Sequence, residues 1–209
     1  MLTEISNNIF WLGHDGFMIK ADDKIVVIDP YQVALAEPAD VLLITHAHYD
    51  HCSMKDIEKL QTDSTVIVTE PESARQLSGD IRIMKPGDAL EVNGIKIEAV
   101  AAYNTDKKFH PKEKNWLGFI VTLGGCRIYH AGDTDLIEEM ADLHVDIALL
   151  PVSGTYVMTA EEAVEAAKRI KPKIAIPMHY DSLVGSEVDA KTFAKGLEEI
   201  CEVKIIKRF

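Results

Sequence analysis

The sequence has few cysteines, no long apolar run and a deficit of positive charge. Its three cysteines (Cys52, Cys126 and Cys201) are scattered and odd in number, which excludes a disulfide framework and favours a reducing compartment. No stretch approaches the roughly 18 uninterrupted apolar residues of a membrane helix, so we expect no membrane partner. Residues 1–4 begin neither a basic nor an apolar leader, so we expect no signal peptide and a cytoplasmic protein.

Basic residues are outnumbered by acidic ones. The chain carries 22 Lys and Arg against 34 Asp and Glu, a net charge of −12 at pH 7. Nucleic-acid binding requires clustered positive charge, so we expect a small-molecule substrate and no nucleic-acid partner. A hydrophobic content of 47% over 209 residues is enough for one large globular core, and we expect residues 1–209 to form a single domain. Nothing in the sequence fixes the oligomeric state.

Three histidines and one aspartate lie within six positions: His46, His48, Asp50 and His51. No packing rule requires such a cluster, whereas imidazole nitrogen and carboxylate oxygen are ligands of zinc, iron and manganese. The apolar run 41–44 before it predicts a buried strand, and a strand end is a usual place for a site in an α/β protein. Four ligands exceed what one zinc ion with an open position needs, so the cluster predicts two divalent metal ions.

Short strand and helix signals alternate along the whole chain. Strands are predicted at 9–12, 17–20, 25–29, 41–45, 65–69, 81–84, 95–101, 118–123, 127–130, 147–150, 174–177 and 203–206, and helices at 54–60, 71–77, 160–170 and 189–201. The strands come in two batches, each followed by strand–helix alternation, which favours a β-sandwich core with outer helices. The polar segment 105–115 is long for a connection and is typical of a functional loop.

Further candidate ligands lie far from the cluster in sequence. Asp133 and His179 each follow an apolar strand directly, where a side chain can reach into a site; a turn aspartate and an ordinary loop histidine are the alternatives. His110 lies in the polar loop, a position that by itself favours solvent exposure over ligation. His130 is consistent with either the core or the surroundings of a site.

Taken together, these residues resemble the metallo-β-lactamase superfamily. The resemblance rests on the motif His-x-His-x-Asp-His at 46–51, the tract Gly132-Asp133-Thr134 and the late His179, in that order. Within the superfamily the chain looks most like the small, lactonase-like metal-dependent hydrolases. This resemblance implies an α/β fold, a four-layer αββα sandwich with the metal site at one edge between the sheets.

The resemblance also implies a ligand for each metal. It implies that His46 and His48 bind the first metal, that Asp50, His51 and His179 bind the second, and that Asp133 bridges the two. The family's remaining histidine ligand of the first metal has no counterpart at the end of strand 95–101, where Asn104 stands. We assign His110, six residues later, to that position.

The expected activity is that of a metal-dependent hydrolase. Two divalent ions, zinc first with manganese or iron as alternatives, would hold a metal-bound hydroxide that attacks a small ester, lactone or phosphodiester. Asp50 is the predicted carrier of the proton to the leaving group, and by resemblance His14 would donate a hydrogen bond to the developing oxyanion, with simple packing as its alternative. An iron-dependent redox enzyme on the same scaffold and a non-enzymatic metal-binding domain are the competing hypotheses.

Overall fold

The run Val41–Ile44 forms strand β4 of a six-stranded sheet in the computed structural model, which describes residues 2–34 and 37–209. All its residues are buried: Val41 and Leu43 belong to one apolar cluster, Leu42 and Ile44 to another. Successive side chains of a strand point to opposite faces, so a strand covered on both faces has an uninterrupted apolar sequence.

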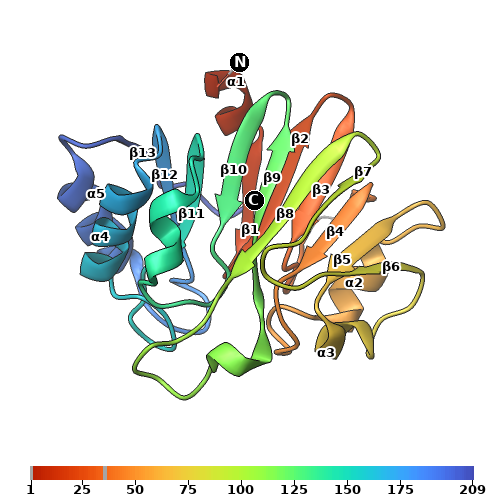
Figure 1. Cartoon of the computed structure of the whole chain (residues 1–209). Coiled ribbons are helices and arrows are strands. Elements are labelled where there is room, and N and C mark those ends of the chain that lie inside the picture. Colours follow the sequence, from red (N-terminus) through yellow and green to blue (C-terminus); the bar gives the residue numbers. More distant parts are fainter. Residues whose placement is uncertain (1, 35–36) are drawn as a thin grey trace.

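The first sheet has the strand order β1-β2-β3-β4-β5-β6 (Figure 1). Strands β1 to β3 are antiparallel, and β3 to β6 run parallel. Besides β4, its strands are β1 (Ile9–Gly13), β2 (Gly16–Ala21), β3 (Lys24–Ile28), β5 (Val66–Thr69) and β6 (Asp80–Ile83).

The second sheet has seven strands in the order β13-β12-β11-β10-β9-β8-β7. Its half from β7 to β10 is antiparallel, whereas β10 to β13 run parallel. Its strands are β7 (Ala89–Val92), β8 (Ile95–Ala101), β9 (Leu117–Leu123), β10 (Cys126–His130), β11 (Ile147–Pro151), β12 (Ile174–Met178) and β13 (Glu202–Val203).

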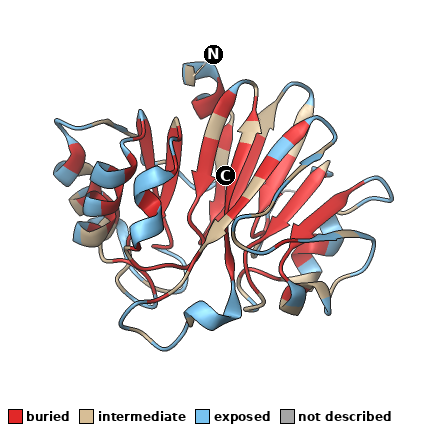
Figure 2. Cartoon of the chain, viewed as in Figure 1, coloured by how far each residue is buried: buried red, intermediate tan, exposed pale blue. Residues whose placement is uncertain are grey.

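The main core lies between the two sheets. Phe17 and Leu43 from the first sheet and Phe119 and Ile128 from the second are fully buried in one cluster. Figure 2 shows the strands of both sheets as mostly buried and the loops as mostly exposed. Burying a large apolar side chain of this kind stabilises the fold by about 1.5–3 kcal/mol, so facing side chains hold the sheets together.

Helices cover the outer face of each sheet. Helix α2 (Met54–Leu60) packs Ile57 and Leu60 against the outer face of the first sheet, and α3 (Pro71–Ala74) lies beside it (Figure 1). On the other side, α4 (Ala160–Ile170) and α5 (Glu187–Leu197) cover β11 to β13. The predicted αββα sandwich is therefore confirmed. Shorter elements are α1 (Leu2–Asn7) and the 3₁₀ helices η1 (Lys112–Lys114) and η2 (Glu138–Asp142).

Several predicted boundaries were wrong. The helix that begins at Pro71 ends at Ala74. The last helix is capped by Ser186, whose hydroxyl accepts a hydrogen bond from the amide of Val188. Asp189 is the third residue of that helix. The final strand shortens to Glu202–Val203. Strand β7 and helix α1 were not predicted, because alternation in so short an element is weak until a neighbour covers it.

The carboxyl ends of β3, β4, β10 and β12 all lead into loops at one edge of the sandwich. In a parallel pair the same ends of both strands lie at the same edge, which brings these loops together within each sheet. Backbone bonds then join the two sheets there: Leu117 N donates to Thr45 O (3.0 Å) and His179 N donates to His14 O (3.2 Å). Residues from distant parts of the chain and from both sheets therefore meet at this edge.

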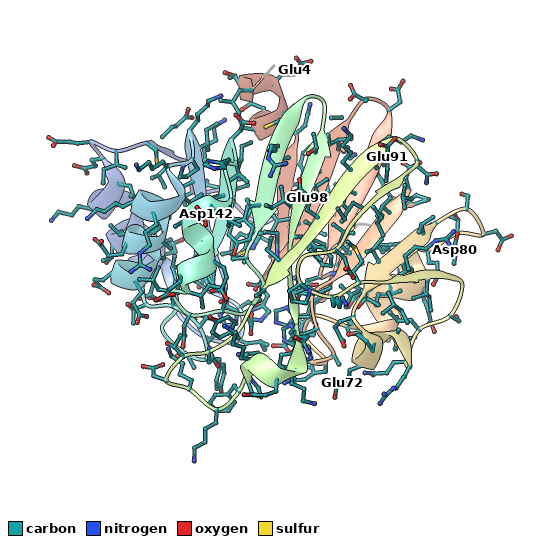
Figure 3. The ribbon with its side chains drawn as sticks, in the orientation of Figure 1. Glu4, Glu72, Asp80, Glu91, Glu98 and Asp142 are labelled. Atoms are coloured by element: carbon teal, nitrogen blue, oxygen red, sulfur yellow. The ribbon has the colours of Figure 1, made fainter. Side chains whose placement is uncertain are left out.

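The excess of acidic residues is spread over the surface. The acidic side chains labelled in Figure 3 come from six different elements of both sheets and their helices, α1, α3, β6, β7, β8 and η2. Among the described residues, no helix is both long and apolar enough to cross a bilayer.

Candidate metal centre

The loop after β4 forms a tight turn around His48. The backbone amides of His51 and Cys52 both donate to His48 O, at 3.0 and 2.8 Å. This turn reverses the chain before α2 and brings the side chains of the motif to one side. His46 and His51 are buried, whereas Asp50 stays partly exposed.

His110 joins His46 and His48 in a first group of nitrogens. The ligand atoms of the three lie within 4.8 Å of one another, and His46 Nε2 is 2.9 Å from His48 Nδ1. The ring of Trp116 packs against the ring of His46 with 4.7 Å between centroids and forms a wall of the group. Three converging imidazoles are the donor set typical of a zinc site with an open position.

Asn104 holds His110 in place from the side away from the cluster. Asn104 Oδ1 lies 3.0 Å from His110 Nδ1 and accepts from the His110 amide at 3.0 Å. The carbonyl of Tyr156 lies 3.2 Å from the same Nδ1. With two acceptors at Nδ1, the proton of a neutral ring belongs there and Nε2 is free to bind a metal. The structure therefore places His110, and not Asn104, in the cluster.

A second group of side chains lies next to the first, with Asp133 between them. The ligand atoms of Asp15, His51, Asp133 and His179 also lie within 4.8 Å of one another. Asp133 Oδ2 is 3.1 Å from His110 Nε2 and 3.5 Å from His179 Nε2, and Asp133 Oδ1 is 3.4 Å from His51 Nε2. A carboxylate in contact with both groups is suited to bridging two ions.

His14 and Asp50 lie beside this second group. His14 Nε2 is 3.2 Å from Asp50 Oδ2, and the same oxygen is 4.0 Å from His51 Nε2. A ring nitrogen of His14 also lies within 4.8 Å of the ligand nitrogens of His51 and His179. His14 is buried, so its contact with the more exposed Asp50 links the interior of the site to its mouth.

Buried hydrogen bonds orient the second group. Asp29 Oδ2 lies 2.8 Å from His51 Nδ1 and accepts from Thr45 Oγ1 at 2.5 Å, and Asp29 Oδ1 accepts from Thr45 N at 2.8 Å. Ser153 Oγ lies 2.9 Å from His179 Nδ1. Such bonds fix the ring and the tautomer, so the Nε2 atom of each ring is the one presented to the cluster.

Three residues of the site have a left-handed backbone. The φ angles are +52° at His14, +44° at Asp29 and +59° at His179. This region costs a non-glycine residue on the order of 1 kcal/mol or more, and it persists only where the surroundings impose it. Strain of this kind concentrates at sites where side-chain direction matters more than local stability.

Burial and neighbouring charges shift the pKa values of the cluster in different directions. Burial lowers the pKa of His46 and of His48, so both rings are neutral and available as ligands. Burial alone would also lower the pKa of His51, but the carboxylates of Asp133 and Asp29 outweigh it and raise that pKa well above its usual value. Burial would raise the pKa of Asp133, yet the surrounding histidines, His51 first, hold it well below its usual value.

Among the described residues, many buried polar atoms of the cluster form no well-directed hydrogen bond, and the polar neighbours of several of them are other ligand atoms. These buried atoms are both ring nitrogens of His14, both carboxylate oxygens of Asp15, Nε2 of His51 and of His110, and Oδ1 of Asp133. One unsatisfied buried group costs about 1–3 kcal/mol, so a concentration of them is unfavourable unless a ligand satisfies it. Divalent cations fit this donor set, because nitrogen and oxygen lone pairs converge there from several directions.

The structure brings all the predicted metal ligands to this one edge. They are His46, His48, Asp50, His51, His110, Asp133 and His179. Their individual roles stay predictions. His14, predicted to be catalytic, lies among them. His130 supports the site from outside, since its Nε2 lies 2.8 Å from Asp15 O.

Asp15 was not predicted to be part of the site, and the sequence did not predict that Ser153 and Asn104 orient His179 and His110. Ser153 comes just after β11, the position from which β10 and β12 supply Asp133 and His179, so the same strand-end rule would have found it. Asp15 lies between His14 and Gly16 in a tight turn. The sequence signal for this residue was the polar pair His14-Asp15 between Gly13 and Gly16.

Comparison with known proteins agrees with this geometry. A family model described as the beta-lactamase superfamily domain matches residues 8–179. A UPF0173 metal-dependent hydrolase from Archaeoglobus fulgidus is 35% identical over 225 residues, covering 95% of this chain and 95% of that protein. One from Thermoplasma acidophilum is 34% identical over 201 residues, covering 88% of each.

A solved structure is also similar. It is that of a protein from Parabacteroides distasonis, provisionally assigned as a metal-dependent hydrolase, with a TM-score of 0.85 and 35% identity over 95% of this chain and 91% of that chain. These relatives favour the hydrolase over the redox and the non-enzymatic hypotheses. With a family model matching residues 8–179 and relatives above 30% identity over most of its length, the chain belongs to the metal-dependent hydrolases of the β-lactamase superfamily.

Proposed function

We propose that the protein hydrolyses a small carboxylic ester or lactone that carries an apolar group. The observation that carries this proposal is the composition of the cavity over the cluster. It has a volume of about 390 Å³, within the range of small-molecule sites. Of the described residues that line it, none is Lys or Arg, so a phosphorylated or strongly anionic substrate would find no cationic side chain to pair with.

The mouth of the cavity is apolar and aromatic. Tyr49, Phe109, Tyr156 and Leu183 line it with 68%, 54%, 40% and 42% of their surface exposed. The rings of Phe109 and Tyr156 meet edge to face, 4.5 Å between centroids. Large apolar side chains that gather at one exposed place favour contact with an apolar ligand. An aliphatic or aromatic acyl group fits this mouth.

The reaction needs metal ions and a proton carrier. Two bound divalent ions, zinc in the first group of ligands, would supply Lewis-acid activation of water and of the substrate carbonyl. Asp50 lines the cavity and is partly exposed, so it can take a proton from the attacking water and deliver it to the leaving alcohol. His14 Nε2, 3.2 Å from Asp50 Oδ2, is better placed to orient Asp50 than to contact an oxyanion.

The test is hydrolysis of a chromogenic ester series from acetate to octanoate, with a bis-aryl phosphate for comparison. If the apolar mouth binds the acyl chain, each added CH₂ should raise kcat/KM by about fourfold, which corresponds to about 0.8 kcal/mol. His48→Ala and Asp50→Ala should abolish turnover without unfolding the protein. A preference of the wild-type protein for the phosphate diester would contradict the proposal.

A matched pair of variants tests the mouth itself. Phe109→Ala removes a ring from the cavity, whereas Ile83→Ala removes a similarly exposed apolar side chain (59% against 54%) from strand β6, outside it. Phe109→Ala should reduce the dependence on chain length, mainly by raising KM for the long esters, and Ile83→Ala should leave it unchanged. Equal effects of the two substitutions would count against an acyl-binding mouth.

A further inference from the structure

Asp15 is a fully buried carboxylate whose two oxygens both lack a hydrogen-bond partner. Burying a carboxylate is costly unless it is paired or coordinates a cation. The buried carboxylates of Asp29 and Asp56 illustrate the usual solution, since each accepts at least three hydrogen bonds. Within the described part of the chain, Asp15 accepts no such bonds, and its neighbour Asp133 is itself a carboxylate that can bond to Asp15 only if one of the two is protonated.

The turn that carries Asp15 is held firmly. Trp11 Nε1 donates to His14 O at 2.8 Å, and the amide of His179 donates to the same oxygen at 3.2 Å. His130 Nε2 lies 2.8 Å from the carbonyl of Asp15 itself. Three groups from β1, β10 and the loop after β12 therefore fix this turn, and the direction of the Asp15 side chain follows from the fold.

The Asp15 side chain points into the second group of ligands. An oxygen of Asp15 lies within 4.8 Å of the ligand atoms of His51, Asp133 and His179. We propose that Asp15 is a direct ligand of the second metal ion. Together with Asp50 and the shared Asp133, it gives this position three carboxylates and two imidazoles.

The two positions then differ in chemistry. The first is made by three imidazoles, from His46, His48 and His110, with the shared carboxylate of Asp133. Nitrogen-rich tetrahedral surroundings suit zinc, whereas two histidines with several carboxylates suit metals that take five or six ligands, such as Mn²⁺ and Fe²⁺. Asp15 therefore shifts the selectivity of the second position toward these metals.

A purely structural role for Asp15 predicts a different result. As a neutral carboxylic acid it would donate a hydrogen bond to the nearby Asp133 and bind no metal. Asp15→Asn separates the two roles, because asparagine keeps the shape and a hydrogen-bond donor but removes the negative charge. Asp15→Ala removes both and serves as the second variant.

The experiment measures metal binding, with no substrate present. Metal-free protein is loaded with one equivalent of Zn²⁺ and titrated with Mn²⁺, and free Mn²⁺ is followed by its EPR signal. Elemental analysis after dialysis counts the bound ions. Asp146→Asn is the control, because Asp146 bonds to Arg127 and Lys173 before the amino end of β11, at the opposite edge of the sheet. Circular dichroism and melting of the metal-free variants verify the fold.

Asp15→Asn and Asp15→Ala should both weaken Mn²⁺ binding by about tenfold or more, with a smaller effect on the first equivalent of Zn²⁺. Asp146→Asn should match the wild-type protein. Wild-type Mn²⁺ affinity in a folded Asp15→Asn protein would overturn the assignment, and so would equal losses for the first and second ions. The role of Asp15 does not depend on the substrate, so this failure would leave the ester proposal standing.

Discussion

Replacing Asp29 with asparagine should disable the second metal position without touching a ligand atom. Asp29 is fully buried and its carboxylate binds Thr45 N, Thr45 Oγ1 and His51 Nδ1 at 2.8, 2.5 and 2.8 Å. Asparagine has nearly the same shape but only one acceptor oxygen. Whichever way its amide turns, at least one donor loses its acceptor: Thr45 N in one orientation, and Thr45 Oγ1 together with His51 Nδ1 in the other.

The effect on His51 follows from its tautomer. In the native protein Nδ1 carries the proton toward Asp29 and Nε2 faces the cluster. Where the amide NH₂ of asparagine lies opposite Nδ1, the ring keeps a hydrogen bond only by moving its proton to Nε2, the atom that binds the metal; where the amide oxygen lies there, a neutral acceptor holds the Nδ1 proton more weakly than the carboxylate does. Changes of this kind around a ligating histidine reduce metal affinity by about 10–100-fold, or about 1.4–2.7 kcal/mol.

The folded protein should also lose stability. One hydrogen bond to a charged group contributes about 1.5–3 kcal/mol, and an unsatisfied buried donor adds a further cost, so we expect a loss of about 2–4 kcal/mol. Chelator competition gives the metal affinity, and denaturant unfolding of the metal-free protein gives the stability. A folded Asp29→Asn protein that binds two ions as tightly as the wild type would refute the reasoning about the tautomer.

Three further predictions concern other parts of the structure. Asn104→Ala removes the acceptor 3.0 Å from His110 Nδ1 and should weaken the first Zn²⁺ by about tenfold in a competition titration; unchanged affinity would contradict a positioning role. Burial would raise the pKa of Asp56, but Lys59 and other hydrogen-bond donors outweigh it and lower that pKa, so Asp56 stabilises the fold above about pH 4, the unfolded value, and less as the pH falls through the folded value. Asp56→Asn should therefore cost about 1.5–3 kcal/mol in urea unfolding at pH 7 and less below pH 4, and a difference independent of pH would be inconsistent with this account. Adding metal at about 100 times its Kd should stabilise the metal-free protein by about 2.7 kcal/mol per ion, seen as a rise in Tm of about 5–10 °C that a chelator reverses; an unchanged Tm would mean that the cluster does not bind the ion used.

Elements with a strong local signal could be predicted from the sequence. The continuous apolar run of β4 reports burial on both faces, and the residues of the predicted helix 54–60 are those of α2. The helix after Thr159 starts with a capping box, in which Thr159 Oγ1 accepts from Glu162 N and Glu162 Oε2 accepts from Thr159 N. These signals are local, so no tertiary contact is needed to read them.

Elements that depend on a neighbour could not be predicted. Helix α1 has six residues and buries Ile5 in the main core. Strand β7 alternates only between exposed and half-buried residues, and its pairing with β8 defines it. Elements this short are marginal alone, so their existence is decided by packing.

By itself, the sequence determined the chemistry of the site and the order of its parts: a motif of histidines and an aspartate after β4, then one aspartate and one histidine at later strand ends. Only the tertiary structure decided that His110 faces the cluster with Asn104 behind it, and that Asp15 points inward. The reason is physical. Ligand type is a property of each residue, whereas convergence depends on loops that are far apart in sequence and are positioned by the packing of two sheets.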